Sequence, residues 1–225
     1  MAMSPIYVPG KVVLAQQQKF PAVLGEPWGG GYFAGYISHT ANGSPTHALI
    51  VAPRATGATG GGYTLTTNLQ WKTANTTTAG TTSSFDGAAN TAAIVAAGIS
   101  DHPAAQFCVN LSIGGFTDWY LPSRYEMSIA YFNLKPTTAV NDAFSGANPY
   151  SVPLRAINNT TTYPSITHVT GFTNTSEAFV ADFHWISEQS AISTAFVYRF
   201  SNGQEGASDP KVNTFRTRAF RRIAL

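Results

Sequence analysis

The sequence predicts an α+β fold with an antiparallel sheet, two or three short helices and long loops. Strand-like segments lie at both ends of the 225-residue chain, and helix-like segments lie in the middle. Only 11% of the residues are charged, where an ordinary soluble domain has about 25%. Thr, Ser, Asn and Gly fill the difference, which favours strands and hydrogen-bonded turns over exposed helices. The length suits one domain, since single mixed domains reach about 250 residues.

The first part of the chain is predicted to be an arm followed by a hairpin. Residues 1–31 hold four prolines and the Gly29-Gly30-Gly31 run, so we expect an extended attachment arm with at most one edge strand. The domain proper is expected over residues 32–225. Residues 32–39 and 46–52 alternate in the manner of strands around an Ala-Asn-Gly-Ser turn, which predicts a β-hairpin. Residues 54–86 are predicted to be long loops around one short strand.

The middle of the chain carries the helix signals. An Ala-rich segment, residues 88–97, predicts a short helix with Asn90 as its N-cap. A second helix is expected to start at Pro103 and run through Leu111. The strongest local signal is the capping box of Ser123 and Glu126, which precedes an apolar-periodic run and predicts a helix over about 124–134. A further short helix is expected around residues 138–144.

The last third is predicted to hold a polar loop and three strands. Residues 145–176 are rich in turn formers, and strands are expected over 183–187, 195–201 and 215–223. Asn202-Gly203 marks a turn, and residues 202–213 are expected to form a second loop. In the final strand a period of two places Arg216, Arg218 and Arg222 together, which predicts one paired arginine, Arg221, and a basic outer face. Such a face could alternatively bind acidic polysaccharide or phosphate.

Charge, cysteine content and motifs exclude several classes of protein. A formal net charge of +2 is too weak for a nucleic-acid binder. The single cysteine, Cys108, cannot form an intrachain disulfide and is expected to be a buried packing thiol. The start of the chain lacks the regions of a signal peptide, and no apolar run reaches about 18 residues. We therefore expect a soluble protein, made in the cytoplasm, without membrane insertion.

No catalytic or cofactor motif is present in the sequence. The five histidines lack metal-ligand spacing, no Gly-x-Ser-x-Gly occurs, and the glycine run near residue 60 lacks the Lys-Ser/Thr of a P-loop. Asp86, Asn90 and Asp118 could supply oxygens to calcium, but Asp and Asn beside Gly are ordinary turn and cap residues. We therefore predict no enzyme activity, no cofactor and no metal, and leave calcium at a loop as the open alternative.

Several phrases in a fixed order resemble a known family. They are Leu69-Gln70-Trp71-Lys72-Thr73, Asp86-Gly87-Ala88-Ala89-Asn90-Thr91, His102-Pro103-Ala104-Ala105, Gly114 to Ser123 (GGFTDWYLPS), His184-Trp185-Ile186-Ser187-Glu188 and Arg218-Ala219-Phe220-Arg221-Arg222. In this order they look like the C-type-lectin-like domain of bacterial collagen-like adhesins and of bacteriophage tail and fibre proteins. The resemblance covers about residues 30–225. The sequence departs from the family at His184, where Tyr is usual, and at Ile186, where Ser is common.

The resemblance implies a C-type-lectin-like fold in which the motif residues are structural. Trp119 and Trp185 are expected to pack the helix start against the sheet, because buried aromatic side chains stabilise cores. The residues to which a structural role is assigned are Asp118, Trp119, Leu121, Pro122, Ser123, Glu126, Trp185, Ser187, Glu188, Arg218 and Arg221.

The resemblance also implies the function. By this resemblance the chain is expected to be a non-enzymatic virion protein of a tailed bacteriophage. It would lie at a tail fibre or baseplate tip and bind a host surface glycan or protein. Residues 1–31 would attach it to other virion proteins, and a homo-oligomer is expected, with a trimer favoured. The alternatives are a capsid or tail decoration protein without receptor binding, and a bacterial surface adhesin module.

Receptor contacts are expected in the two loops, because loops carry binding residues more often than regular elements do. Tyr and Asn offer amphipathic rings and adaptable hydrogen bonds. The candidates are Tyr150, Asn158, Asn159, Tyr163 and His168 in the first loop, and Asn202, Gln204, Glu205 and Asp209 in the second.

Overall fold

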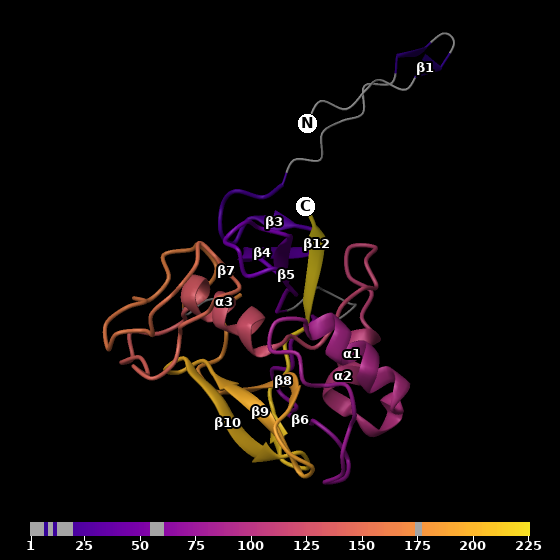
Figure 1. Cartoon of the computed structure of the whole chain (residues 1–225). Helices are drawn as coiled ribbons and strands as arrows, with labels where there is room; N and C mark the ends of the chain where they lie inside the picture. The colour runs from indigo at the N-terminus through magenta and orange to yellow at the C-terminus, as the bar shows by residue number, and fades with distance from the viewer. Residues whose placement is uncertain (1–6, 9–10, 13–19, 55–60, 174–176) are drawn as a thin grey trace.

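The computed structural model describes residues 7–8, 11–12, 20–54, 61–173 and 177–225. In these residues the chain has an α+β architecture of antiparallel sheets and three short helices, as predicted (Figure 1). The largest sheet has the order β12-β5-β4-β3, and β7 pairs with β4. Its strands are β3 (Pro27–Trp28), β4 (Gly31–Ile37), β5 (His47–Val51), β7 (Ser151–Val152) and β12 (Phe220–Ala224).

A second sheet of three strands has the order β10-β9-β8. It contains β8 (Phe183–Gln189), β9 (Thr194–Arg199) and β10 (Gln204–Pro210). Two further pairs are small, and they join β6 (Leu69–Gln70) to β11 (Thr214–Phe215) and β1 (Tyr7–Val8) to β2 (Lys11–Val12). In Figure 1 the large sheet lies above the second sheet, α1 and α2 flank them on one side, and α3 with the loops that follow it lies on the other.

The β4–β5 hairpin is buried on both faces. It is confirmed in the structure, with a turn in which Ala41 and Gly43 have positive φ values of 52° and 80°. Along β5, Ala48 and Ile50 belong to one core cluster, whereas Leu49 and Val51 belong to the other. Both faces of the strand are therefore covered, which explains why this segment is continuously apolar rather than alternating.

The predicted boundary at residue 31 does not match the packing. Pro27 and Trp28 pair with Tyr32 and Gly31 as strand β3, and the Gly25 N–H donates to the Phe33 carbonyl at 2.8 Å. The Phe20 and Trp28 rings lie 6.2 Å apart. Residues 20–31 therefore belong to the folded domain. The remainder of the predicted arm, apart from the short strands β1 and β2, lies outside the described residues.

Two of the predicted helices are observed with small changes, and one is not. The first is α1 (Gly87–Ala96), and its N-cap is Asp86, which accepts from the Ala89 N–H at 2.8 Å. Asn90 is therefore not the cap; its amide donates to the Ser187 hydroxyl at 2.9 Å. The second is α2 (Pro103–Val109), preceded by a 3₁₀ turn, η2 (Ile99–Asp101). Residues 138–144 contain no helix.

The capped helix is α3 (Arg124–Leu134), with the predicted bounds. Its capping box is present, and the Glu126 carboxylate accepts from the Ser123 N–H at 2.8 Å. Its apolar face, which includes Met127, Ala130 and Leu134, is fully buried in the second core cluster. Because it packs beside β4, α3 holds the start of the following loop against the large sheet.

The C-terminal segment differs from the prediction at two points. Residues 204–210 form strand β10 rather than a loop. The predicted final strand is interrupted: β11 ends at Phe215 and β12 begins at Phe220, and Arg218 between them has no exposed surface. The change of strand partner between these two elements turns Arg218 inward, so the expected alternation of faces does not hold there.

The expected basic outer face is also wrong. Each of the four arginines is paired with a carboxylate: Arg216 with Asp182 at 3.3 Å, Arg218 with Glu177 at 3.2 Å, Arg221 with Asp118, and Arg222 with Asp86 at 2.6 Å. The partners come from three different parts of the chain, around residues 86, 118 and 177–182, and they neutralise the cluster that looks unpaired in the sequence.

Candidate functional site

The phrases that carry the family resemblance contact one another in the structure. The Trp71 indole N–H donates to the Ile186 carbonyl at 2.8 Å, and the Trp185 indole N–H donates to the Leu69 carbonyl at 2.7 Å. The Leu121 N–H donates to the Thr91 hydroxyl at 3.1 Å. Segments far apart in sequence are thus joined by hydrogen bonds. We call the six phrases, residues 69–73, 86–91, 102–105, 114–123, 184–188 and 218–222, the motif cluster.

Two buried carboxylates hold the motif cluster at the start of α3. Glu126 accepts from the Gly87 N–H at 3.1 Å and from the Tyr120 hydroxyl at 2.6 Å. Glu188 accepts from the Arg124 N–H at 2.9 Å, so both acids lie at the positive end of the helix. Burial raises the pKa of Glu126, and it raises the pKa of Glu188 to about 7.

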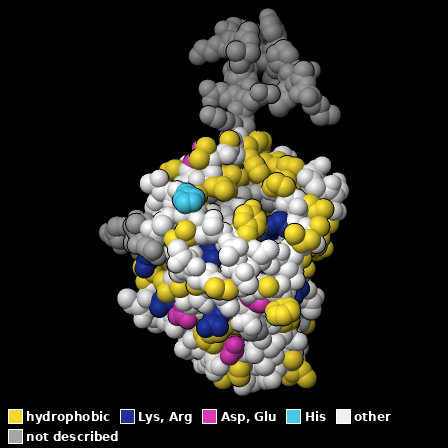
Figure 2. All heavy atoms as spheres, turned by 90° about the vertical axis from the view of Figure 1, so that its left-hand side faces the viewer, with side chains coloured by type: hydrophobic (Ala, Val, Ile, Leu, Met, Phe, Trp, Pro, Cys, Tyr) yellow, Lys and Arg dark blue, Asp and Glu magenta, His cyan; other side chains and the backbone are white. Residues whose placement is uncertain are grey.

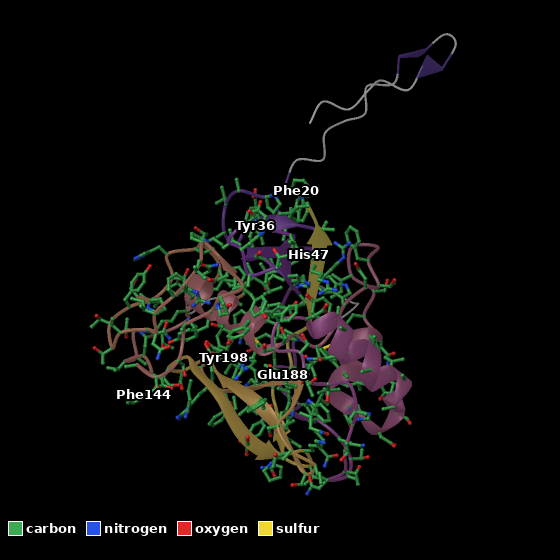
Figure 3. All side chains as sticks on the ribbon, in the orientation of Figure 1. Phe20, Tyr36, His47, Phe144, Glu188 and Tyr198 are labelled. Carbon is green, nitrogen blue, oxygen red and sulfur yellow. The ribbon has the colours of Figure 1, made fainter. Side chains whose placement is uncertain are left out.

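The motif residues have the surroundings of a scaffold. Trp119 and Trp185 are buried in the first core cluster, and Leu121, Ser123 and Ser187 have no exposed surface. Figure 3 shows Glu188 in the middle of the molecule, enclosed by side chains. Burial of this kind is what a packing role requires. Asp118 differs, because its side chain is 56% exposed although it is paired with Arg221.

Exposed hydrophobic side chains, which could contact a partner, are concentrated in the segment between α3 and β8. We call residues 135–173 the α3–β8 loop. Of the nine large hydrophobic side chains that are exposed among the described residues, five lie in it, including Phe144 at 91% and Ile157 at 78% exposure. Figure 3 places Phe144 at the outer edge of the molecule, and Figure 2 faces this side, where hydrophobic side chains are scattered over the surface among a few charged ones.

Two hollows lie along the α3–β8 loop. The larger is an open groove of about 800 Å³ between residues 22–26 and 163–170. The smaller, which we call the Arg155 hollow, has a volume of about 360 Å³ and lies between α3 and residues 151–160. Phe132, Asn133 and Tyr163 line both hollows. The rings of Phe132 and Tyr163 meet edge to face with centroids 5.2 Å apart, so they form the wall between the two.

Arg155 supplies the only full charge in the lining of the smaller hollow. Its guanidinium lies over the Phe132 ring at 4.5 Å and donates to the Ser128 hydroxyl at 2.9 Å. Burial lowers the pKa of Arg155, although the group stays charged. Within the described chain, no carboxylate lies at ion-pair distance from it.

The predicted ligand-binding residues divide into two groups. Asn158, Asn159 and Tyr163 line the Arg155 hollow, and Tyr163 and His168 line the larger groove. Tyr150 is not with them, because its ring is stacked on Phe85 at 4.3 Å.

The four candidates near the C-terminus lie on the β9–β10 hairpin and not in a binding loop. Asn202 and Gln204 are in or next to its turn, where the Gln204 N–H donates to the Asn202 side chain at 3.2 Å. The Glu205 carboxylate accepts from the Gly146 N–H at 3.1 Å, so it supports the α3–β8 loop from behind. Asp209 accepts from the Asn213 amide at 3.2 Å.

Sequence reasoning missed Arg155, Phe132 and Asn133 as parts of the site. Phe132 and Asn133 were hidden in the helix pattern, where nothing shows which face meets a loop. Arg155 did give a signal: it is the only Lys, Arg, Asp or Glu between Asp142 and Glu177. The span between those two acids is 34 residues long. A single charged residue in such a span is a candidate for a specific interaction.

The two acids considered as calcium ligands have other partners in the structure. Asp86 caps α1 and is paired with Arg222, and Asp118 is paired with Arg221. In the part of the chain that the structure describes, no three His, Cys, Asp or Glu side chains are grouped so that they could hold a metal ion. Over the same residues, no helix is long and apolar enough to span a membrane.

Comparisons with known proteins give no family. No protein-family model matches the chain, and no curated protein matches it.

Proposed function

We propose that this chain is a non-enzymatic virion protein that binds a host surface receptor through the α3–β8 loop. The observation that carries the proposal is the concentration of exposed hydrophobic side chains on that loop, beside two hollows that share Tyr163. Aromatic rings and amides at the rim of a hollow are typical of recognition surfaces, because they offer apolar area and hydrogen bonds together.

The proposal includes a C-type-lectin-like fold and a place at a phage tail fibre or baseplate tip. The contacts within the motif cluster support the fold, since the six phrases would be expected to meet if they define one architecture. The proposal places attachment to other virion proteins in the residues before Phe20, and it favours a trimer.

Particle labelling tests the proposed place in the virion. Antibody raised against the purified chain should label the distal end of the tail on the virus that encodes it. Regular labelling over the capsid would favour the decoration protein, and particles without label would contradict both versions.

Adsorption tests the proposed contact surface. A Tyr163→Ala, Phe144→Ser double variant should keep its melting temperature, because both side chains are exposed, and it should lose binding to host cells. The matched control is Ile192→Ser, a hydrophobic residue in the β8–β9 turn whose exposed fraction, 68%, lies between those of Tyr163 and Phe144. Equal cell binding by the double variant and the control would contradict the assignment of this loop.

A further inference from the structure

The Arg155 hollow has an imbalance of hydrogen-bond donors. Among the described residues, the Arg155 guanidinium donates to the Ser128 hydroxyl and has no acid at ion-pair distance. Asn159, which lines the same hollow, is 7% exposed, and its Nδ2 is buried without a hydrogen-bond partner among the described residues. The Asn159 amide packs against Gly146, which lies outside the lining, so the donors that a ligand in the hollow can meet are those of the guanidinium. Because donors without acceptors are unfavourable, Arg155 favours a ligand that supplies them.

Glu205 is an acid that compensates Arg155 in part. Its carboxylate interacts with Ser128, which also accepts from Arg155, and the two opposite charges act on each other. Gly146 also donates to Glu205 from the loop. Glu205 does not line the hollow, so the lining itself contains no negative charge.

The walls of the hollow are apolar. Ile129, Pro153, Leu154 and Ile157 line it, together with the rings of Phe132 and Tyr163. A volume of about 360 Å³ accommodates one six-membered sugar ring with its substituents and excludes a larger cofactor. The C–H face of a pyranose can pack on such walls, while its oxygens meet the amides.

We infer that the Arg155 hollow binds a single hexuronic acid residue of an acidic surface polysaccharide, with the sugar carboxylate on Arg155 and the ring against Tyr163. Arginine suits this role because its planar fork matches a carboxylate in a bidentate geometry. The inference rests on the proposed function and specifies its ligand.

Titration of the full chain with simple sugars tests the inference. Binding of galacturonic and glucuronic acid, followed by NMR at millimolar concentrations, should be at least about tenfold tighter than binding of galactose and glucose. Arg155→Gln should remove this difference. The matched control is Arg199→Gln, because Arg199 lies on β9 outside the hollow and stacks on Phe183 at 5.0 Å.

Folding is checked separately from binding. If Arg155→Gln melts early, Tyr163→Ala replaces it, since this exposed side chain forms the rim; it should weaken uronate binding with an unchanged melt. Equal affinity for acidic and neutral sugars, no saturable binding of either uronate, or unchanged binding by these variants would overturn the inference. Inorganic phosphate that binds as tightly as the uronates would also overturn it, because the site would then recognise an anion and not a sugar.

The outcome separates this inference from the proposed function. If the Tyr163→Ala, Phe144→Ser variant loses cell binding while the parent chain binds no uronate, the result supports the receptor-binding function and contradicts the uronate ligand. Uronate binding without a contribution of this loop to adsorption rejects the function and leaves the sugar site.

Discussion

Arg218 has no exposed surface, and its guanidinium is fully engaged. Its Nε donates to the Ala52 carbonyl and its Nη1 to the Glu177 carbonyl, both at 2.9 Å. It lies 4.3 Å above the Phe179 ring, and burial lowers its pKa to about 10. At neutral pH the group is charged, and Glu177 is the charge that compensates it.

Arg218→Met should destabilise the protein by about 3–5 kcal/mol, because it leaves Glu177 and the carbonyl groups without their partner. Urea denaturation measures the change. Arg199→Met serves as the control and should lose no more than about 1 kcal/mol, since Arg199 has no carboxylate partner within the described chain. Equal losses in the two variants would show that the buried pair has no special importance.

His184 is held neutral by its surroundings. Its Nδ1–H donates to the Asp182 carbonyl at 3.0 Å, and its Nε2 accepts from the Tyr63 hydroxyl at 2.7 Å, which itself accepts from the Val180 N–H. Burial lowers the pKa of His184 to about 3. Between pH 6.5 and 3 the unfolded chain therefore binds a proton that the folded chain does not, and the free energy of unfolding falls as the pH falls.

This contribution should amount to about 2–3 kcal/mol between pH 7 and 4.5. Glu188, with its pKa raised to about 7, acts in the opposite direction, because the folded state takes up a proton first as the pH falls. The informative quantity is thus the difference in pH slope between the parent and His184→Phe, measured by urea denaturation at both pH values.

At the scale of elements, local signals sufficed where local contacts decide the structure. Helix α3 was predicted with its bounds because both partners of the capping box lie within four residues. The cap of α1 was assigned to the wrong residue because Asp86 and Asn90 are both good caps, and only the contact between Asn90 and Ser187 distinguishes them. Strand β10 was missed because it is an edge strand with Gly206, Asp209 and Pro210, and its partner β9 provides the pairing.

Strand β3 leads to a test of the domain boundary. Deletion of residues 1–31 should lower the melting temperature strongly, since it removes strand β3 and the hydrogen bond from Gly25 to Phe33. Deletion of residues 1–19 ends before these contacts and should leave a cooperative transition close to that of the full chain. Calorimetry of the two truncated chains measures the difference, and identical curves would restore the boundary at residue 31.

At the scale of the whole molecule, the sequence predicted the class of fold but not the pairing of its charges. The four C-terminal arginines pair with carboxylates from three separate segments, and no local pattern reports such partners. The candidate site was predicted in part, since three of the nine candidates line the Arg155 hollow. Its floor comes from α3, and only the folded chain brings that helix face to the loop.

Cys108 provides a reporter of global opening. It is fully buried in the first core cluster, and burial raises the pKa of its thiol. Its reaction with a disulfide reagent should therefore be very slow in the native protein and should accelerate with urea in parallel with unfolding. Fast labelling in the absence of urea, at a rate independent of stability, would show that a local opening reaches this part of the core.

The α3–β8 loop is fixed from the inside. Asn141 accepts from the Tyr131 hydroxyl at 2.6 Å and donates to the Thr160 and Pro164 carbonyls at 3.0 Å, and the Lys135 ammonium donates to the Ala139 carbonyl at 2.6 Å. The path of the backbone thus depends on a few interior groups, while the outward side chains contribute little to folding. Mutation can exchange those outward residues while the shape of the scaffold is inherited intact. If the loop binds a receptor as proposed, a change of host range then requires selection on this one loop only.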